Sequence, residues 1–159
     1  LFRSPPREKA MSSVTDNTNA KFIKKLESTN KMDSIDELAR VFTGSGVCED
    51  IDGLIKALKE REEIMSTGIG FGIAIPHARL HGVKKLTFAV GISEAGIDFD
   101  SMDGQPVRLI ILVAAGEKQH KEYLRLLSTI MAVLKKEGTK ETIIRSKTSE
   151  ETLRALSGE

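Results

Sequence analysis

Apolar residues recur at helical spacing in two stretches of the first half of the chain. They are Ile35, Leu38, Ala39 and Phe42 in the first stretch and Ile51, Leu54, Ile55 and Leu58 in the second. Ser34 and Glu37 match a capping box, so the first helix is predicted to begin at Ser34 and to end at Gly44. Asp50 is a suitable N-cap for the second helix, which we expect to end before Gly68.

Between residues 68 and 115 the pattern becomes that of β-strands. Ile73, Ala74 and Ile75 form a short apolar run that Pro76 closes. Apolar and small or polar residues then alternate over residues 86–93, which predicts a half-buried strand. The run from Val107 to Ala115 is almost continuously apolar and is typical of a strand covered on both faces.

Helical spacing returns after Gly116, and the stripe predicted to be buried comprises Tyr123, Leu124, Leu127, Met131 and Leu134. His120 lies one turn ahead on the same predicted face. Two shorter helices are expected around Ile143 and after Thr148. The order of elements predicts one α/β domain in which a central mixed sheet has helices on both sides.

Residues 1–31 differ in composition from the rest of the chain. Seven basic and three acidic residues give this segment a charge of +4, and Ser, Pro and Asn are frequent in it. We interpret residues 1–31 as a basic, flexible leader and residues 32–159 as the domain. Within the leader, only Phe22, Ile23 and Leu26 suggest a segment that docks on the domain.

Composition excludes several classes of protein. The chain has 159 residues, of which 40% are hydrophobic and 30% charged, as in a globular domain. Its longest apolar run is too short to cross a bilayer, and a net charge of +1 gives no global reason to bind nucleic acid. Cys48 is the only cysteine, so an internal disulfide is excluded. We expect a cytoplasmic protein without direct membrane insertion.

His77 is the strongest candidate for chemistry because it directly follows Pro76 at the end of a predicted strand. Proline restricts the local backbone and so holds the imidazole in a defined direction. A neutral imidazole nitrogen so placed is suited to nucleophilic attack on phosphorus. The alternative is an ordinary structural histidine, which is the more frequent role of a histidine taken alone.

Three nearby features have weaker functional interpretations. Gly68, Gly70 and Gly72 precede a predicted strand, whereas the glycines of a nucleotide-binding loop follow a strand, so such a loop is not indicated. The three glycines indicate either a sharp turn or a set of backbone amides that could solvate phosphate oxygens. His81 lies four residues after His77, but the segment is too short for a helical metal pair. Arg61 belongs to a charge run and is either solvated or a phosphate or partner contact.

His120 lies near the predicted N-terminus of the long helix, directly after the apolar strand. Unpaired amides and the macrodipole favour anions there, so a second imidazole could bind a phosphoryl oxygen or steady the first ring. The alternative is a solvated residue on the helix surface.

One continuous motif resembles a known family. Glu60-Arg61-Glu62 followed by Ser66–His77 (STGIGFGIAIPH) resembles the enzyme IIA domain of the bacterial phosphoenolpyruvate-dependent sugar phosphotransferase system. The nearest class is the mannitol/fructose type, which includes the nitrogen-regulatory IIA proteins. Further matches are Gly96–Phe99, Asp103–Val107 and His120 with Leu124 and Leu127.

The resemblance implies a phosphoryl relay on a mixed sheet flanked by helices. His77 would accept a phosphoryl group from the histidine-containing phosphocarrier protein and pass it to an enzyme IIB domain or use it as a regulatory signal. His120 would correspond to the second active-site histidine and Arg61 to an arginine for phosphate charge or partner docking. No metal, nucleotide or other cofactor is implied, and no nucleic-acid partner. Since no IIB-like cysteine motif is present in the sequence, regulation is slightly favoured over transport.

Two other classes of function remain alternatives. One is a regulatory binding module that has the same fold but no phosphotransfer. The other is a zinc-dependent hydrolase that uses His77, His81 and His120. Retention of His77, His120 and Arg61 argues against the first alternative.

Overall fold

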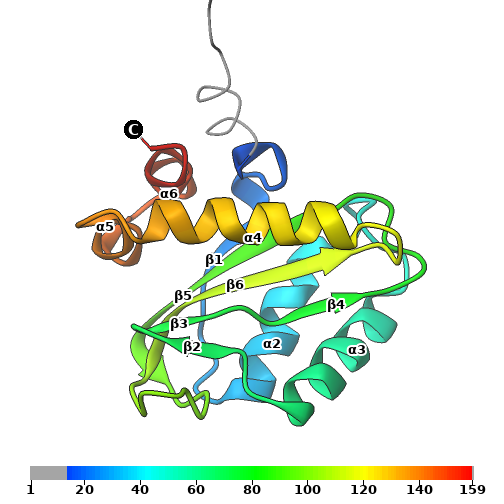
Figure 1. Ribbon diagram of the computed structural model, residues 1–159, viewed down its shortest axis with the longest axis horizontal. Helices are drawn as coiled ribbons and strands as arrows, with labels where there is room; N and C mark the ends of the chain where they lie inside the picture. The colour runs from blue at the N-terminus through cyan, green and yellow to red at the C-terminus, as the bar shows by residue number, and fades with distance from the viewer. Residues whose placement is uncertain (1–13, 159) are drawn as a thin grey trace, which may run out of the picture.

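The computed structural model describes residues 14–158, and the chain forms one α/β domain (Figure 1). The short 3-10 helices are η1 (Ala20–Phe22) and η2 (Arg40–Phe42). The α-helices are α2 (Lys31–Ala39), α3 (Ile51–Ile64), α4 (His120–Leu134), α5 (Thr139–Arg145) and α6 (Ser149–Leu156). The strands are β1 (Ile23–Lys25), β2 (Gly68–Gly70), β3 (Ile73–Ala74), β4 (His77–Arg79), β5 (Thr87–Ile97) and β6 (Val107–Ala115).

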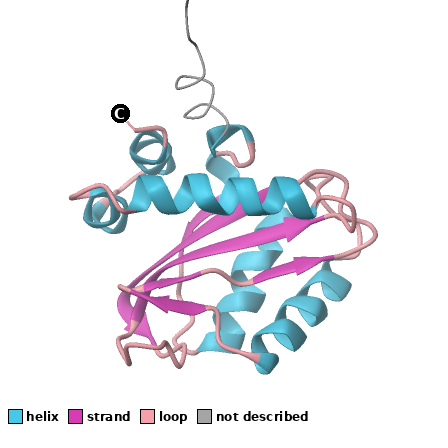
Figure 2. Cartoon of the chain, viewed as in Figure 1, coloured by secondary structure: helices cyan, strands magenta, loops and turns pink. Residues whose placement is uncertain are grey.

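The six strands form a mixed sheet, coloured magenta in Figure 2. The order is β1-β5-β6-β3-β2, and β4 also pairs with β6. Strands β5 and β6 are antiparallel, whereas β1 is parallel to β5 and both β3 and β4 are parallel to β6. Thus β6 is the central strand, and three other strands hydrogen-bond to it.

Helices α2 and α3 cover one face of this sheet, and α4, α5 and α6 cover the other (Figure 1). Successive side chains of β6 enter the two cores in turn: Ile110, Leu112 and Ala114 face α2 and α3, and Leu109, Ile111 and Val113 face α4 to α6. The prediction of a strand covered on both faces over Val107–Ala115 is confirmed, as is the single α/β domain.

Helix α3 begins where the sequence predicts. The side chain of Asp50 accepts a hydrogen bond from the amide of Gly53 at 2.9 Å, and the helix runs from Ile51 to Ile64. Leu54, Ile55 and Leu58 are buried against the sheet. The N-cap and the apolar spacing therefore indicate the same helix, and both could be identified in the sequence.

The first long helix, in contrast, begins three residues before its predicted start. Asn30 is the N-cap of α2, and its Oδ1 accepts from the amide of Asp33 at 2.9 Å. Ser34 lies inside the helix and donates from Oγ to the carbonyl of Lys31. The prediction of a capping box at Ser34 and Glu37 is wrong. The carboxylate of Glu37 instead accepts hydrogen bonds from the amide and the hydroxyl of Ser28, in the loop that precedes the helix.

Part of the predicted leader belongs to the domain. Val14 is fully buried, β1 pairs with β5, and the carbonyl of Asn17 accepts from the amide of Phe88 at 2.8 Å. The interpretation of residues 1–31 as a separate leader is therefore wrong for residues 14–31. A strand of three residues gives no periodicity in the sequence, since its stability comes from pairing with β5. Residues 1–13 of the predicted leader lie outside the described residues.

The buried face of α4 also differs from the prediction. Its buried residues are Tyr123, Leu126, Ile130, Val133 and Leu134. Leu124, predicted to be in the stripe, is 50% exposed. The helix is thus rotated from the predicted face, and this rotation changes which side chains reach the end of the sheet.

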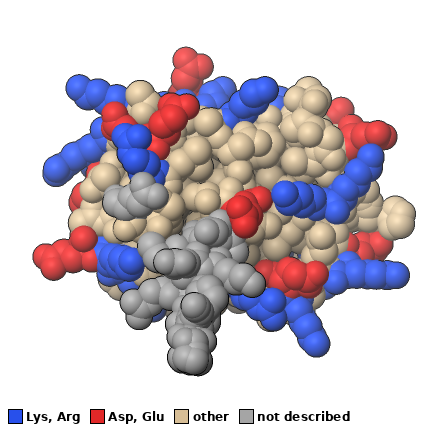
Figure 3. Space-filling view, turned by 90° about the horizontal axis from the view of Figure 1, so that it is seen from above, with Lys and Arg blue, Asp and Glu red and all other residues tan. Residues whose placement is uncertain are grey.

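Charge on the surface is mixed. On the face in Figure 3, basic and acidic side chains are interspersed, and neither sign of charge forms a large patch. This agrees with a net charge of +1 for the whole chain. No helix in residues 14–158 has the length and apolar character needed to cross a bilayer.

Glu37 fastens the loop between β1 and α2. Its carboxylate accepts from Ser28 Oγ at 2.6 Å and from the amides of Glu27 and Ser28 at 3.0 and 2.9 Å, and it pairs with Lys24 at 3.2 Å. Burial alone would raise the pKa of Glu37, but these hydrogen bonds outweigh it and lower the pKa to about 2. The ionised form therefore stabilises the fold.

Glu37→Gln should lower the free energy of unfolding by about 1–2 kcal/mol at pH 7, because charge-assisted hydrogen bonds are lost. A carboxyl with a lowered pKa stabilises above its unfolded-state pKa of about 4.3 and loses this contribution as the pH falls toward 2. The difference between variant and unmodified protein in urea unfolding should therefore shrink between pH 5 and pH 2. Glu49→Gln, at an exposed residue, serves as the control. A difference that stays constant with pH would contradict the assignment.

Candidate functional site

A break at Pro76 places His77 at the end of the central strand. Strand β3 ends at Ala74, and β4 begins at His77 and continues along the same neighbour. The carbonyl of Pro76 accepts from the amide of Val113 at 2.9 Å, and His77 pairs with Val113 in the register of β4 and β6. His77 is therefore fixed by backbone pairing beside the last residues of β6.

The ring of His77 is oriented by its own chain. Nδ1 lies 3.0 Å from the carbonyl oxygen of Ile75. A carbonyl oxygen only accepts, so Nδ1 carries the proton and donates it in this bond. In the neutral ring, Nε2 is then the nitrogen with the free lone pair. This is the arrangement that a nitrogen nucleophile requires.

The surroundings of His77 keep the ring neutral. Burial lowers the pKa of His77 below its ordinary value near 6.5, and the positive charges of Arg61 and Arg79 act in the same direction. The hydrogen bond to Ile75 and the carboxylate of Glu62 oppose this shift without reversing it. At neutral pH the imidazole is therefore unprotonated at Nε2.

A cleft of about 560 Å³ opens in front of His77. Its walls are the last turns of α3, strand β4 and the start of the loop after β6, and its lining residues are Ala57, Glu60, Arg61, Ile64, His77, Ala78, Arg79 and Glu117. The cleft thus brings together His77 and Arg61, which are 16 positions apart in the sequence. Both belonged to the predicted site.

Arg61 is held at the C-terminal end of α3. Its Nη1 donates to the carbonyl of Met65 at 2.8 Å. The next residue, Glu62, has a fully buried side chain that accepts from the amide and the hydroxyl of Thr67 at 2.8 and 2.6 Å. Lys31 Nζ lies 3.5 Å from the same carboxylate. This network fastens the end of α3 to β2, and so fixes the backbone that carries Arg61.

A tyrosine contacts both histidines of the predicted site. The ring centroid of Tyr123 lies 5.1 Å from that of His77 and 6.3 Å from that of His120. Tyr123 is 8% exposed and His120 is exposed, and neither is among the lining residues of the cleft. Sequence reasoning missed Tyr123 because it was counted only as an apolar position of α4. Its place three residues after His120 was the available signal.

The glycine turn has no part in the cleft. Gly70, Phe71 and Gly72 all have positive φ, at 97°, 59° and 78°. The amide of Phe71 donates to Asp103 at 3.0 Å, so it is not free for phosphate. Of the two interpretations of these glycines, the structural turn is the one supported. The motif serves the fold by reversing the chain between β2 and β3.

His81 and Cys48 lie outside the site. The side chain of His81 is 96% exposed, and its Nδ1 lies 2.9 Å from Glu117. Cys48 is buried. Within residues 14–158, no group of three or more His, Cys, Asp and Glu side chains is placed to hold a metal ion.

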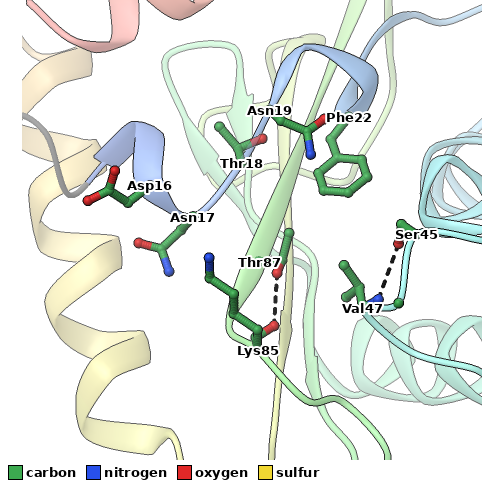
Figure 4. A pocket seen from close by; sticks show the side chains of 10 residues that line it. Asp16, Asn17, Thr18, Asn19, Phe22, Ser45, Val47, Lys85 and Thr87 are labelled. Atoms are coloured by element: carbon green, nitrogen blue, oxygen red, sulfur yellow. Dashed lines mark hydrogen bonds between the residues drawn. The ribbon is translucent and has the colours of Figure 1, made fainter.

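A second hollow, of about 200 Å³, lies beside the N-terminal segment (Figure 4). It is formed by residues 16–19, by Phe22, by the loop of residues 45–47 and by Lys85 and Thr87. The hydroxyl of Thr87 donates to the carbonyl of Lys85 at 2.8 Å, and the amide of Val47 donates to Ser45 Oγ at 3.2 Å. No histidine lines this hollow, so the cleft at His77 is the better candidate for chemistry.

Comparison with known proteins points to the same family as the Ser66–His77 motif. The family model "Phosphoenolpyruvate-dependent sugar phosphotransferase system, EIIA 2" matches residues 17–158. The PTS system fructose-specific EIIA component of Haloferax volcanii is 34% identical over 120 residues, which are 76% of this chain and 78% of that protein. The fructose-specific EIIABC component of Bacillus subtilis is 35% identical over 79% of this chain, which spans only 20% of that protein.

Solved structures show the same fold. The nitrogen regulatory protein IIA-Ntr from Neisseria meningitidis superposes with a TM-score of 0.83 at 27% identity, covering 91% of this chain and 99% of that one. The complex of enzyme IIAMTL and phosphorylated enzyme IIBMTL from Escherichia coli gives 0.76 at 21% identity, covering 89% and 97%. At 21% identity, the similarity to the Escherichia coli complex shows a shared fold only.

The lowered pKa of His77 is open to a direct test. Its imidazole should titrate below about 6.5 in NMR spectra, because burial and the charge of Arg61 both disfavour the imidazolium. Arg61→Gln removes one of these charges and should raise the midpoint. Lys56→Gln, which removes an exposed charge from the same helix outside the cleft, should leave it unchanged. A midpoint at or above 6.5 in the unmodified protein would contradict the effect of burial.

Proposed function

The chain belongs to the EIIA 2 family of the phosphoenolpyruvate-dependent sugar phosphotransferase system, and we propose that it carries a phosphoryl group on Nε2 of His77. The observation that supports this most directly is the hydrogen bond from His77 Nδ1 to Ile75, which leaves the lone pair on Nε2. The lowered pKa of His77 keeps that lone pair available at neutral pH.

The proposed reaction transfers a phosphoryl group between two imidazoles. Nε2 of His77 attacks the phosphorus of a phosphohistidine on the donor protein. The new N–P bond forms while the donor's N–P bond breaks, and the bonding electrons return to the donor's ring nitrogen. No net proton is released, since each ring keeps the proton on its other nitrogen. Bonds of the same kind are made and broken, so positioning of the two rings dominates the rate.

Arg61 supplies positive charge on the wall of the cleft. Its guanidinium is bound to the carbonyl of Met65, a neutral acceptor, on the rim of the same cleft. A phosphoryl dianion on His77 is a stronger acceptor, because charge-assisted hydrogen bonds are about twice as strong as neutral ones. We propose that Arg61 binds phosphoryl oxygens once His77 is modified. The support predicted for His120 remains a prediction, since its ring is exposed and outside the cleft.

The rim of the cleft suits a protein partner. Ile64 is 79% exposed on the cleft wall, and Met65 next to it is 68% exposed. Large apolar side chains in such positions are typical of protein-binding surfaces. The proposed donor is the histidine-containing phosphocarrier protein. The proposed acceptor is an enzyme IIB domain or a regulatory target, and the two differ only in which protein docks on this rim.

The carrier function predicts one acid-labile phosphoryl group on the chain. Intact mass should be measured after incubation with phosphoenolpyruvate, enzyme I and the phosphocarrier protein. The unmodified chain should gain one phosphoryl group, His77→Ala should gain none, and the exposed His81→Ala should behave as the unmodified chain. If the unmodified chain gains no mass while a competent IIA protein in the same tube does, the proposal fails and a binding module of the same fold is favoured.

Arg61→Lys should slow phosphoryl transfer by about tenfold to a hundredfold, because a single ammonium cannot replace the guanidinium fork. Rapid quenching of the transfer from the phosphorylated carrier measures this rate. Lys56→Arg, on the same helix but outside the cleft, is the matched control. An unchanged rate in Arg61→Lys would remove Arg61 from the transfer step.

A further inference from the structure

Tyr123 is the aromatic side chain that meets the ring of His77. Their ring centroids are 5.1 Å apart with an angle of 33° between the planes. This distance lies within the range of favourable aromatic pairs. His77 is thus held from two directions, by the carbonyl of Ile75 at Nδ1 and by the ring of Tyr123.

The hydroxyl of Tyr123 is available to a ligand. Although the residue is 8% exposed, its hydroxyl has no hydrogen bond to a residue in 14–158 and is not among the fully buried side-chain atoms without a partner, so it reaches the surface. The phenol also lies close enough to Arg61 to feel its positive charge, so the hydroxyl belongs to the same polar region as His77 and Arg61.

His120 is less well placed for this role. Its ring centroid lies 6.3 Å from that of Tyr123, and its side chain is exposed. Tyr123 has a ring contact with each histidine, whereas no ring contact joins the two histidines to each other within residues 14–158. The position next to His77 is therefore taken by a phenol.

We propose that Tyr123 is a further active-site residue, whose hydroxyl donates a hydrogen bond to the phosphoryl group carried on His77. The proposal rests on the proposed function, because it concerns the phosphorylated state of the same histidine. The hydroxyl proton stays on Tyr123, and no bond to oxygen or phosphorus is broken in this contact. Tyr123 then stabilises the negative oxygens while Nε2 of His77 forms the N–P bond.

A phenol is chemically suited to this contact. Burial raises the pKa of Tyr123 above its ordinary value near 10, and the charge of Arg61 opposes this only in part. The hydroxyl is therefore protonated throughout the neutral range and remains a donor. A neutral donor adds no charge beside His77, so it does not disfavour the attack of a neutral imidazole on a dianionic group.

Tyr123→Phe is the decisive variant, because it removes the hydroxyl and keeps the ring that packs on His77. We expect kcat for phosphoryl transfer from the carrier to fall about tenfold, with KM for the carrier unchanged. Phospho-His77 should also hydrolyse faster than in the unmodified chain. Thr129→Val, which removes a hydroxyl from the same helix away from the cleft, is the matched control. Unfolding temperatures of both variants should match that of the unmodified chain.

Tyr123→His adds a rescue, since an imidazole restores a hydrogen-bond donor at this position, and its kcat should exceed that of Tyr123→Phe. Equal kcat in Tyr123→Phe and the unmodified chain would overturn the role of the hydroxyl while leaving the carrier function intact. A larger loss in His120→Ala than in Tyr123→Phe would overturn it as well and assign the role to His120. Failure of the unmodified chain to take phosphate would overturn the carrier function itself.

Discussion

Strand β6 is covered by apolar side chains on both faces, and this constraint determines where chemistry can occur in the domain. Its side chains alternate between the core under α2 and α3 and the core under α4 to α6. Arg108 near the start of the strand is exposed, but an unpaired ionisable group anywhere from Leu109 to Ala115 would carry a large cost of burial. Reactive side chains are therefore confined to the ends of the sheet. His77 stands at such an end, on a short strand that pairs only with the last residues of β6.

The break in strand pairing at Pro76 orients the imidazole of His77. Because β3 stops at Ala74 and pairing resumes at His77, the carbonyl of Ile75 is left free to accept from the imidazole. The same short segment therefore supplies both the imidazole and the carbonyl group that fixes its tautomer. Under the proposed function, the orientation of the phosphoryl acceptor would come from two residues of one chain segment, and the positive charge from Arg61 on the adjacent helix.

Features that depend on local sequence could be predicted, and features that depend on pairing between distant segments could not. The run Val107–Ala115, the cap at Asp50 and the Pro-His step are each visible in a few consecutive residues, and all three occupy the expected places. Strand β1 has three residues and exists because β5 offers it an edge, so its sequence predicts no strand; only the apolar residues Phe22, Ile23 and Leu26 indicated that this segment docks on the domain. Asn30 and Ser34 are both good N-caps, and the choice between them depends on Glu37 being engaged by Ser28.

The same distinction explains why Tyr123 was not predicted as a site residue. Consecutive residues of an α-helix are about 100° apart around its axis, so a stripe that includes Leu124 instead of Leu126 points to a different face. With the face set by Leu126, Ile130 and Val133, Tyr123 turns toward the sheet and His120 remains at its margin. The identity of the second ring beside His77 is thus decided by the packing of α4 on β6. The sequence motif that contains His77 and His120 does not indicate how α4 is rotated about its axis. The buried residues of the helix do indicate this rotation.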